Sequence, residues 1–206
     1  SKLINHSLHH GYISHYPKSI FNEGIIQKNV DYWVKKADCI INGFQIDGLA
    51  RWDILPYNMV TIDEEKIPCK TRWTDFDGHN GTVTIVHSFN HKIIKGTKFL
   101  IDAVNKLKSE GLKIELLLLE HKKNDEILSI LLEKADILVD QLIFGYALAA
   151  IEGMASGLPV ISNLSDESVL SLFRRYSYLN ECPIYSSSPE RIKDDIKLLV
   201  ENPDLR

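Results

Sequence analysis

The sequence predicts an α/β protein built around a doubly wound parallel sheet. From Gly81 onward, short apolar runs alternate with longer segments whose apolar residues recur at helical spacing. Residues 135–163 contain a complete unit of strand, turn, helix and strand, in which Gly157 and Pro159 end the helix. Five such strands alternating with helices over about 125 residues favour a parallel sheet that carries its helices on both faces.

Each element after residue 81 has its own signal in the sequence. The expected strands are 82–87, 113–119, 137–139, a run from Val160 and 183–186, and the expected helices are 97–110, 124–134, 145–156, 166–175 and a last one from Ser188. Four consecutive leucines in 113–119 indicate a strand that is buried on both faces. Ser188 and Pro189 indicate the start of the last helix, as its N-cap and its first residue.

Residues 1–80 are less regular and indicate a partial N-terminal α/β segment that is followed by a linker. The elements expected there are a helix at 27–36, a strand at 39–41 and a short helix within 44–58. Residues 60–80 carry many charges, a proline and the turn-like run Asp-Phe-Asp-Gly-His-Asn-Gly, which is typical of a linker. We therefore expect two parts, namely residues 1–80 and a sheet domain at 81–206.

The composition narrows the class of protein. A net charge of −4 and a pI near 6.1 argue against nucleic acid as a partner. Three cysteines, odd in number and far apart, favour a reducing compartment, so a cytoplasmic protein is expected. No apolar run approaches the roughly 18 residues of a membrane span. Four histidines between residues 6 and 15 lack the accompanying cysteines or acids of a familiar zinc spacing, so no metal site is expected.

The loop after the first strand of the sheet domain is one candidate site, because ligands of open parallel sheets bind beyond the carboxyl ends of the strands. His87, Lys92 and Lys95 stand in or beside this loop, directly before the start of a helix. Helix N-termini and lysine ammonium groups both attract phosphate. The alternative, in which the lysines are only solvated loop residues, stays open.

The loop at 140–146 and the helix after it form a second candidate site. Gly145 allows the backbone to approach a ligand closely, and Glu152 lies seven residues later, almost two helical turns away. A carboxylate there can accept hydrogen bonds from sugar hydroxyls. The alternative is a partly buried acid that pairs with a neighbouring lysine or arginine. No G-x-G-x-x-G follows a strand and no P-loop or G-x-S-x-G occurs, so dinucleotide, ordinary NTPase and serine hydrolase functions lose support.

Three motifs stand out in the C-terminal part: His87…Lys95-Gly96-Thr97 with the helix after it, Ala135-Asp136…Asp140, and Gly145…Glu152-Gly-Met-Ala-Ser-Gly157-Leu-Pro-Val160. With these motifs, residues 81–206 resemble the Rossmann-like, nucleotide-sugar-binding domain of GT-B-fold glycosyltransferases, specifically the group 1 set, glycosyltransferase family 4. The last motif is quite specific. Residues 1–80 look like the closing part of the acceptor-side domain and the linker of such an enzyme, so we expect a fragment or a truncated protein.

The resemblance implies a retaining transfer of a sugar from a nucleoside diphosphate sugar to an acceptor hydroxyl, without a metal ion or another cofactor. Lys95 and Glu152 would be the catalytic residues, because Lys95, together with Lys92, would contact the donor diphosphate and Glu152 would hold the ribose. The donor-binding residues that the resemblance implies are His87, Lys92, Gln141, Phe144, Gly145, Tyr146 and Glu152. Phe144 stands where the family has its first glutamate, in a stretch that begins Asp140-Gln141 as in one subgroup.

The same resemblance implies partners and a cellular role. The partners are a nucleotide sugar and an acceptor glycan or lipid-linked glycan, and the role is the synthesis of surface polysaccharides or glycoconjugates. A missing N-terminal part would attach such an enzyme peripherally to the inner face of the membrane. Two alternatives stay open. One is a non-catalytic GT-B-like module for nucleotide-sugar binding or assembly, which Phe144 favours, and the other is another sugar-nucleotide enzyme, such as an epimerase.

Overall fold

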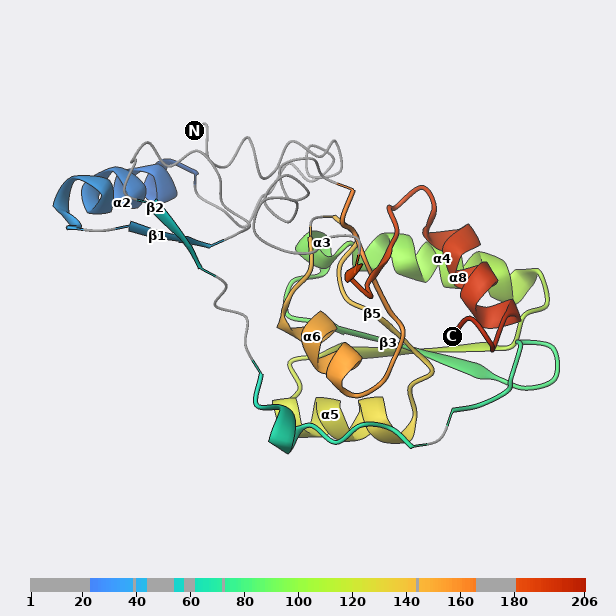
Figure 1. Cartoon of the computed structure of the whole chain (residues 1–206). Coiled ribbons are helices and arrows are strands. Elements are labelled where there is room, and N and C mark those ends of the chain that lie inside the picture. Colours follow the sequence, from blue (N-terminus) through green and yellow to red (C-terminus); the bar gives the residue numbers. More distant parts are fainter. Residues whose placement is uncertain are drawn as a thin grey trace. The chain divides into compact units, whose positions relative to one another are not determined.

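The computed structural model describes residues 23–38, 40–43, 54–57, 62–71, 73–143, 145–165 and 181–206. These residues belong to two compact units. The smaller unit holds the described residues up to 57 and Glu181, and the larger unit holds those from 62 to 165 and from 182 to 206 (Figure 1). The expected helix at 166–175, the candidate residue Phe144 and the four histidines between 6 and 15 lie outside the described residues.

The smaller unit contains a helix and a two-stranded sheet. Helix α2 (Glu23–Lys36) confirms the helix expected at 27–36, and strand β1 (Ile40–Gly43) confirms the strand after it. Strand β2 (Ile54–Tyr57) pairs with β1 in parallel. The expectation of a helix within 44–58 is therefore wrong for the residues of β2. Leu55 precedes a proline, which disfavours the helical conformation, and β1 supplies hydrogen-bonding partners for an extended chain.

The larger unit is built on a five-stranded sheet whose strands are all parallel, and this confirms the predicted α/β class with a parallel sheet. The strands are β3 (Val83–Phe89), β4 (Ile114–Glu120), β5 (Ile137–Val139), β6 (Val160–Ser162) and β7 (Tyr185–Ser186). Their order is β4-β3-β5-β6-β7. The chain thus runs from β3 outward to β4 and then returns to the other side of β3.

Helices connect the strands and cover an apolar core. They are α3 (Lys92–Lys95), α4 (Thr97–Ser109), α5 (Asn124–Glu133), α6 (Leu148–Ala155) and α8 (Ile192–Glu201), and a short 3-10 helix, η1 (Glu64–Lys66), precedes the sheet. Helices α4 and α8 lie side by side (Figure 1), and the core around them includes the fully buried Ile85, Leu100, Ile137 and Ile196. Burial of a side chain of this size stabilises the fold by about 1.5–3 kcal/mol.

The expectation that the strand at 113–119 is buried on both faces is wrong, because the leucines of β4 are not all buried. β4 lies at the edge of the sheet and pairs with β3. Leu118 is 41% exposed, whereas Leu119 is 7% exposed. A run of leucines indicates burial, but the place of the strand in the sheet decides how many of its faces are covered.

Two helices begin later than the sequence predicts. Helix α6 begins at Leu148 rather than at Gly145, because Gly145 adopts a left-handed φ of +58° and forms a backbone bridge with Asn163. Helix α8 begins at Ile192 rather than at Pro189, after a turn at 189–191. At 145–147 the small and apolar residues continue beyond the helix, and at 188–191 the expected start signal of Ser188 and Pro189 precedes a turn instead of the first helical residue.

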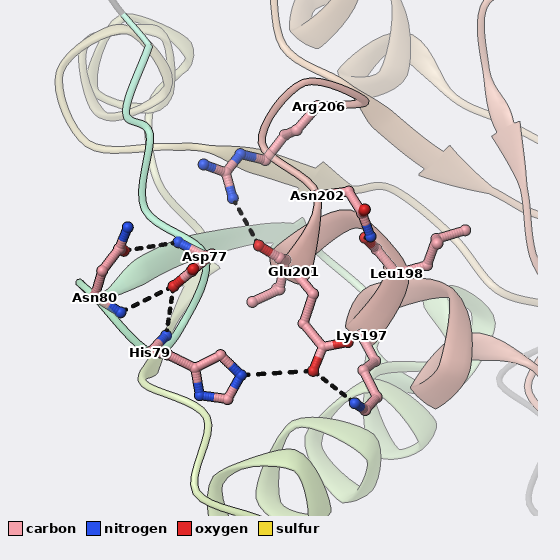
Figure 2. Close-up of polar contacts among 9 residues, drawn as sticks. Asp77, His79, Asn80, Lys197, Leu198, Glu201, Asn202 and Arg206 are labelled. Carbon is pink, nitrogen blue, oxygen red and sulfur yellow. Dashed lines mark hydrogen bonds and ion pairs between the residues drawn. The ribbon is translucent and has the colours of Figure 1, made fainter.

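The segment that was expected as a linker packs as part of the larger unit. The Asp77 carboxylate accepts hydrogen bonds of 2.8 Å from the backbone amides of His79 and Asn80, which closes a tight turn before β3 (Figure 2). These backbone hydrogen bonds lower the pKa of Asp77. His79 also lies 3.7 Å from the carboxylate of Glu201, at the end of α8 (Figure 2). The turn before the sheet therefore contacts the C-terminal helix.

Candidate functional site

The loops after β4, β3 and β5 gather at one edge of the sheet, because neighbouring parallel strands end on the same side. The direction in which strands are added reverses between β3 and β5. Ligands of open α/β sheets bind beyond the carboxyl ends of the strands at such a reversal. We call this edge the carboxyl edge. It carries Lys92 and Lys95 after β3 and Gln141 after β5.

Lys95 and Asp140 form an ion pair at the reversal. Lys95 is the last residue of α3, and its ammonium group binds Oδ1 of Asp140, which directly follows β5. The Asp140 side chain is fully buried, and the Lys95 side chain is 15% exposed. The second carboxylate oxygen, Oδ2, accepts a hydrogen bond of 2.5 Å from the backbone amide of Ala147, the N-cap of α6. Asp140 thus joins α3, β5 and the start of α6.

The sequence pattern identified Lys95 as a site residue and did not identify Asp140. Asp140 belonged to a motif of the resemblance but was given no role in the site. An acid directly after a strand at a reversal of strand order faces the place where ligands bind, but the strand order is known only from the structure. The carbonyl of Lys95 also accepts a hydrogen bond of 3.0 Å from the amide of Leu142, so the backbones of the two loops are held together as well.

Glu152 lies on α6 and reaches the start of α5. Its side chain is mostly buried, at 7% exposure of the residue, and its Oε1 accepts a hydrogen bond of 2.7 Å from the side-chain amide of Asn124. Asn124 is the first residue of α5, which follows β4, so Glu152 belongs to the carboxyl edge. This partner is an amide, rather than the lysine or arginine that the alternative for a buried acid requires. The sequence pattern did not single out Asn124.

Lys92 is a more exposed cation at the same edge. Its ammonium group lies 3.1 Å from Oε2 of Glu120, the last residue of β4, and 5.5 Å from the centre of the Phe89 ring. The Lys92 side chain is 59% exposed. An exposed ion pair of this kind contributes about 0–1 kcal/mol to stability, so the ammonium group can move to another anion at little cost.

His87 lies inside the core and not at the surface of the site. The residue is fully buried, its Nδ1 lies 2.8 Å from the Val139 carbonyl, and its Nε2 lies 2.9 Å from the Thr97 hydroxyl. Because a carbonyl can only accept, Nδ1 carries the proton and Nε2 accepts from the hydroxyl. Burial lowers the pKa of His87 to about 4, so the ring is neutral. It links β3, β5 and the start of α4.

The loop after β5 folds back onto the end of β6. The carbonyl of Gln141 accepts a hydrogen bond of 2.9 Å from the Asn163 amide, and the carbonyl of Gly145 accepts one of 2.6 Å from the Ser162 hydroxyl. Gln141 and Tyr146 are each 7% exposed. These candidate residues are therefore brought to the carboxyl edge, with Gln141 and Gly145 using backbone atoms to shape the loop.

Within the described ranges, no three histidine, cysteine or acidic side chains come together as a metal site. Among the helices that the structure describes, none combines the length and the apolar character that a bilayer span requires. Neither a protein-family model nor a curated protein sequence matches the chain. The resemblance to glycosyltransferases consequently stays a prediction that rests on the motifs.

Proposed function

We propose that residues 81–206 are the donor-binding domain of a retaining GT-B glycosyltransferase, which moves a sugar from a nucleoside diphosphate sugar to an acceptor hydroxyl. In this proposal the parallel sheet is doubly wound. The observation that carries it is the position of the Lys95–Asp140 pair at the reversal of strand order. Glu152 supports it from α6, because it reaches the same edge of the sheet.

The reaction needs positive charge where the diphosphate leaves. Breaking the bond between the sugar and the diphosphate leaves negative charge on the phosphate oxygens, and preorganised cations stabilise that charge. An ammonium group has three donors, and Asp140 receives one from Lys95, so Lys95 can bridge the aspartate and a phosphate oxygen. Lys92 supplies a second, mobile cation from the same loop.

Glu152 would hold the nucleoside part of the donor. Asn124 orients its carboxylate at the start of α5, and carboxylate oxygens accept hydrogen bonds from the two ribose hydroxyls. The acceptor in this proposal is a glycan or a lipid-linked glycan, and the cellular role is the synthesis of surface polysaccharide or glycoconjugates. In this proposal the enzyme contacts the inner face of the membrane peripherally.

Calorimetry with the full chain tests the proposal. UDP, GDP and their sugar conjugates are titrated into the wild-type protein and into Lys92→Met, and uridine and guanosine serve as ligands without phosphate. We expect Lys92→Met to weaken binding of the diphosphates and to leave the nucleosides unaffected. Lys98→Met, which removes an exposed lysine on α4, is the matched control. Absence of binding by every nucleotide would refute the proposal.

A non-catalytic module that binds nucleotide sugars is the second candidate function. The feature of the sequence that favours it is Phe144, which stands where the resembled family has its first glutamate. The two functions differ in turnover. Release of nucleoside diphosphate from a bound nucleotide sugar, followed over time, supports the enzyme, and stable binding without release supports the module.

A further inference from the structure

A pocket of about 510 Å³ lies at the opposite edge of the sheet from Lys95 and Glu152. Its wall includes Asp136, which directly precedes β5, and residues 132–134 at the end of α5, so the pocket belongs to the amino ends of the strands. The other lining residues are Pro68, Cys69, Lys70, Thr71, Trp73 and Thr74. The volume falls within the range of about 300–1,000 Å³ that is usual for small-molecule sites.

Trp73 forms a fixed aromatic wall of this pocket. Its indole Nε1 donates a hydrogen bond of 2.9 Å to the Gly157 carbonyl. A side chain at Gly157 would come within 3.3 Å of the indole, so this glycine leaves room for the ring. Trp73 is nevertheless 52% exposed. One part of the ring is therefore held by the protein, while a large part of its surface is open to the pocket and to solvent.

The segment that carries Trp73 is held in place by the rest of the unit. The Lys70 amide donates a hydrogen bond of 2.9 Å to the Ser156 carbonyl, and the Lys70 ammonium group binds the carbonyl of Ala135. The Thr74 hydroxyl donates one of 2.8 Å to Asp136. Because these bonds come from three places, the pocket is preorganised, and a ligand does not have to order the segment first.

Among the lining residues that the structure describes, charged side chains of both signs occur. Lys70 and Lys134 are cationic, Glu133 and Asp136 are anionic, and the Arg206 guanidinium lies beside the pocket, 2.8 Å from the Thr74 carbonyl. Such a lining offers both donors and acceptors to a neutral ligand with many hydroxyl groups. The open indole surface adds an electron-rich face, which attracts the weakly positive C–H groups of a flat saturated ring.

We propose that this pocket binds a neutral hexopyranose unit of a glycan, which stacks on Trp73. The proposal does not depend on the proposed function, because its residues lie at the other edge of the sheet from the candidate donor site. If the chain is also a glycosyltransferase, this second site would retain a glycan chain while the donor site is occupied or empty.

Nuclear magnetic resonance of the ¹⁵N-labelled full chain tests the proposal directly, because each indole N–H gives its own signal. The probes are maltose, cellobiose, lactose and mannobiose, and Trp73→Phe assigns the signal. We expect at least one of these sugars to shift the Trp73 signal in a saturable manner and to leave the signal of Trp33 in place. Trp73→Ala lacks this signal, so its affinity is measured from the backbone amide signals that the sugar shifts in the wild type, and it should be weaker by about tenfold or more.

Trp33→Ala is the matched control, because Trp33 is also exposed, at 64%, but lies on α2 in the smaller unit. It should bind the sugar as the wild type does, and so should Glu152→Gln, which separates this site from the donor site. The proposal is overturned if none of the four sugars shifts the Trp73 signal. It is also overturned if inorganic diphosphate shifts that signal as strongly as the sugar, or if Trp73→Phe and Trp73→Ala both bind unchanged.

Discussion

The side-chain amide of Asn124 donates a hydrogen bond of 2.7 Å to the carboxylate of Glu152 and thereby joins the start of α5 to the middle of α6. The contact brings together two helices whose contacting residues are 28 positions apart in sequence. It also keeps a mostly buried acid in a defined orientation at the carboxyl edge. A carboxylate that is oriented in this way is suited to accept hydrogen bonds from a bound ligand.

Glu152→Gln should reduce the affinity for UDP or GDP by about tenfold, because a hydrogen bond to a charged group contributes about 1.5–3 kcal/mol and the amide accepts less strongly. The substitution keeps the shape of the side chain, and its carbonyl can still accept from Asn124. Calorimetry measures the affinity. Glu115→Gln, at an exposed acid on β4, is the control. Equal affinities for all three proteins would show that Glu152 does not contribute to nucleotide binding.

Asp140→Asn should lower the free energy of unfolding by about 3 kcal/mol, because it leaves the ammonium group of Lys95 without its buried partner. Urea unfolding of the full chain measures the change. Asp102→Asn breaks the exposed pair with Lys98 and should cost less than about 1 kcal/mol.

A double-mutant cycle isolates the pair itself. Lys95→Met combined with Asp140→Asn should be less destabilised than the sum of the two single variants, because the second change removes the charge that the first left unpaired. Strict additivity would mean that Lys95 and Asp140 do not interact in solution.

The buried His87 should make the protein less stable in acid. Its pKa of about 4 in the folded protein lies below the ordinary value of 6.5, so the unfolded chain binds the proton more readily. The contribution is fully present above pH 6.5 and is lost as the pH falls toward 4. The total loss amounts to about 3 kcal/mol.

The free energy of unfolding, measured at several pH values, should change less between pH 4 and 6.5 for His87→Gln than for the wild type. His91→Gln, at an exposed histidine before α3, should retain the wild-type dependence. If His87→Gln and the wild type have the same slope, the ring is not held neutral by burial.

Gly153→Ala should destabilise the larger unit by about 1–3 kcal/mol, because a methyl group there would lie 2.3 Å from Cδ2 of Leu138 and 3.0 Å from Cγ2 of Val160. Alanine normally favours a helix over glycine, so a destabilising result identifies close packing of α6 on the sheet. Thermal unfolding measures it. Adding Leu138→Val should recover part of the lost stability. If it recovers none, the loss does not arise from the contact with Leu138.

Much of the secondary structure could be predicted from the sequence because its signals are local. Apolar spacing and turn residues located the strands β3, β4 and β5 and the helices α4 and α5 to within a residue or two at each end. The same spacing failed at Gly145, where a bridge to Asn163 holds the chain out of the helix. The contact is formed across 18 positions of sequence, and a local pattern contains no information about it.

The candidate site was predicted in part. Lys95 and Glu152 could be singled out because a lysine after a strand and an acid in an apolar helix are unusual locally. Their partners Asp140 and Asn124 could not, since each becomes a partner only when neighbouring strands bring separate loops to one edge. His87 was expected in the site but lies in the core. A histidine at a strand end can face a ligand or the core, and here the packing of α4 decides which.

By itself, the sequence determined the α/β class and the positions of most strands and helices, because hydrophobic periodicity and turn chemistry act over a few residues. Only the tertiary structure decided that β4 lies at the edge, that Lys95 pairs with Asp140 and that Trp73 lines a pocket at the amino ends. These properties depend on which strands become neighbours. That choice results from the burial of apolar side chains drawn from the whole unit, which no single stretch of the chain specifies.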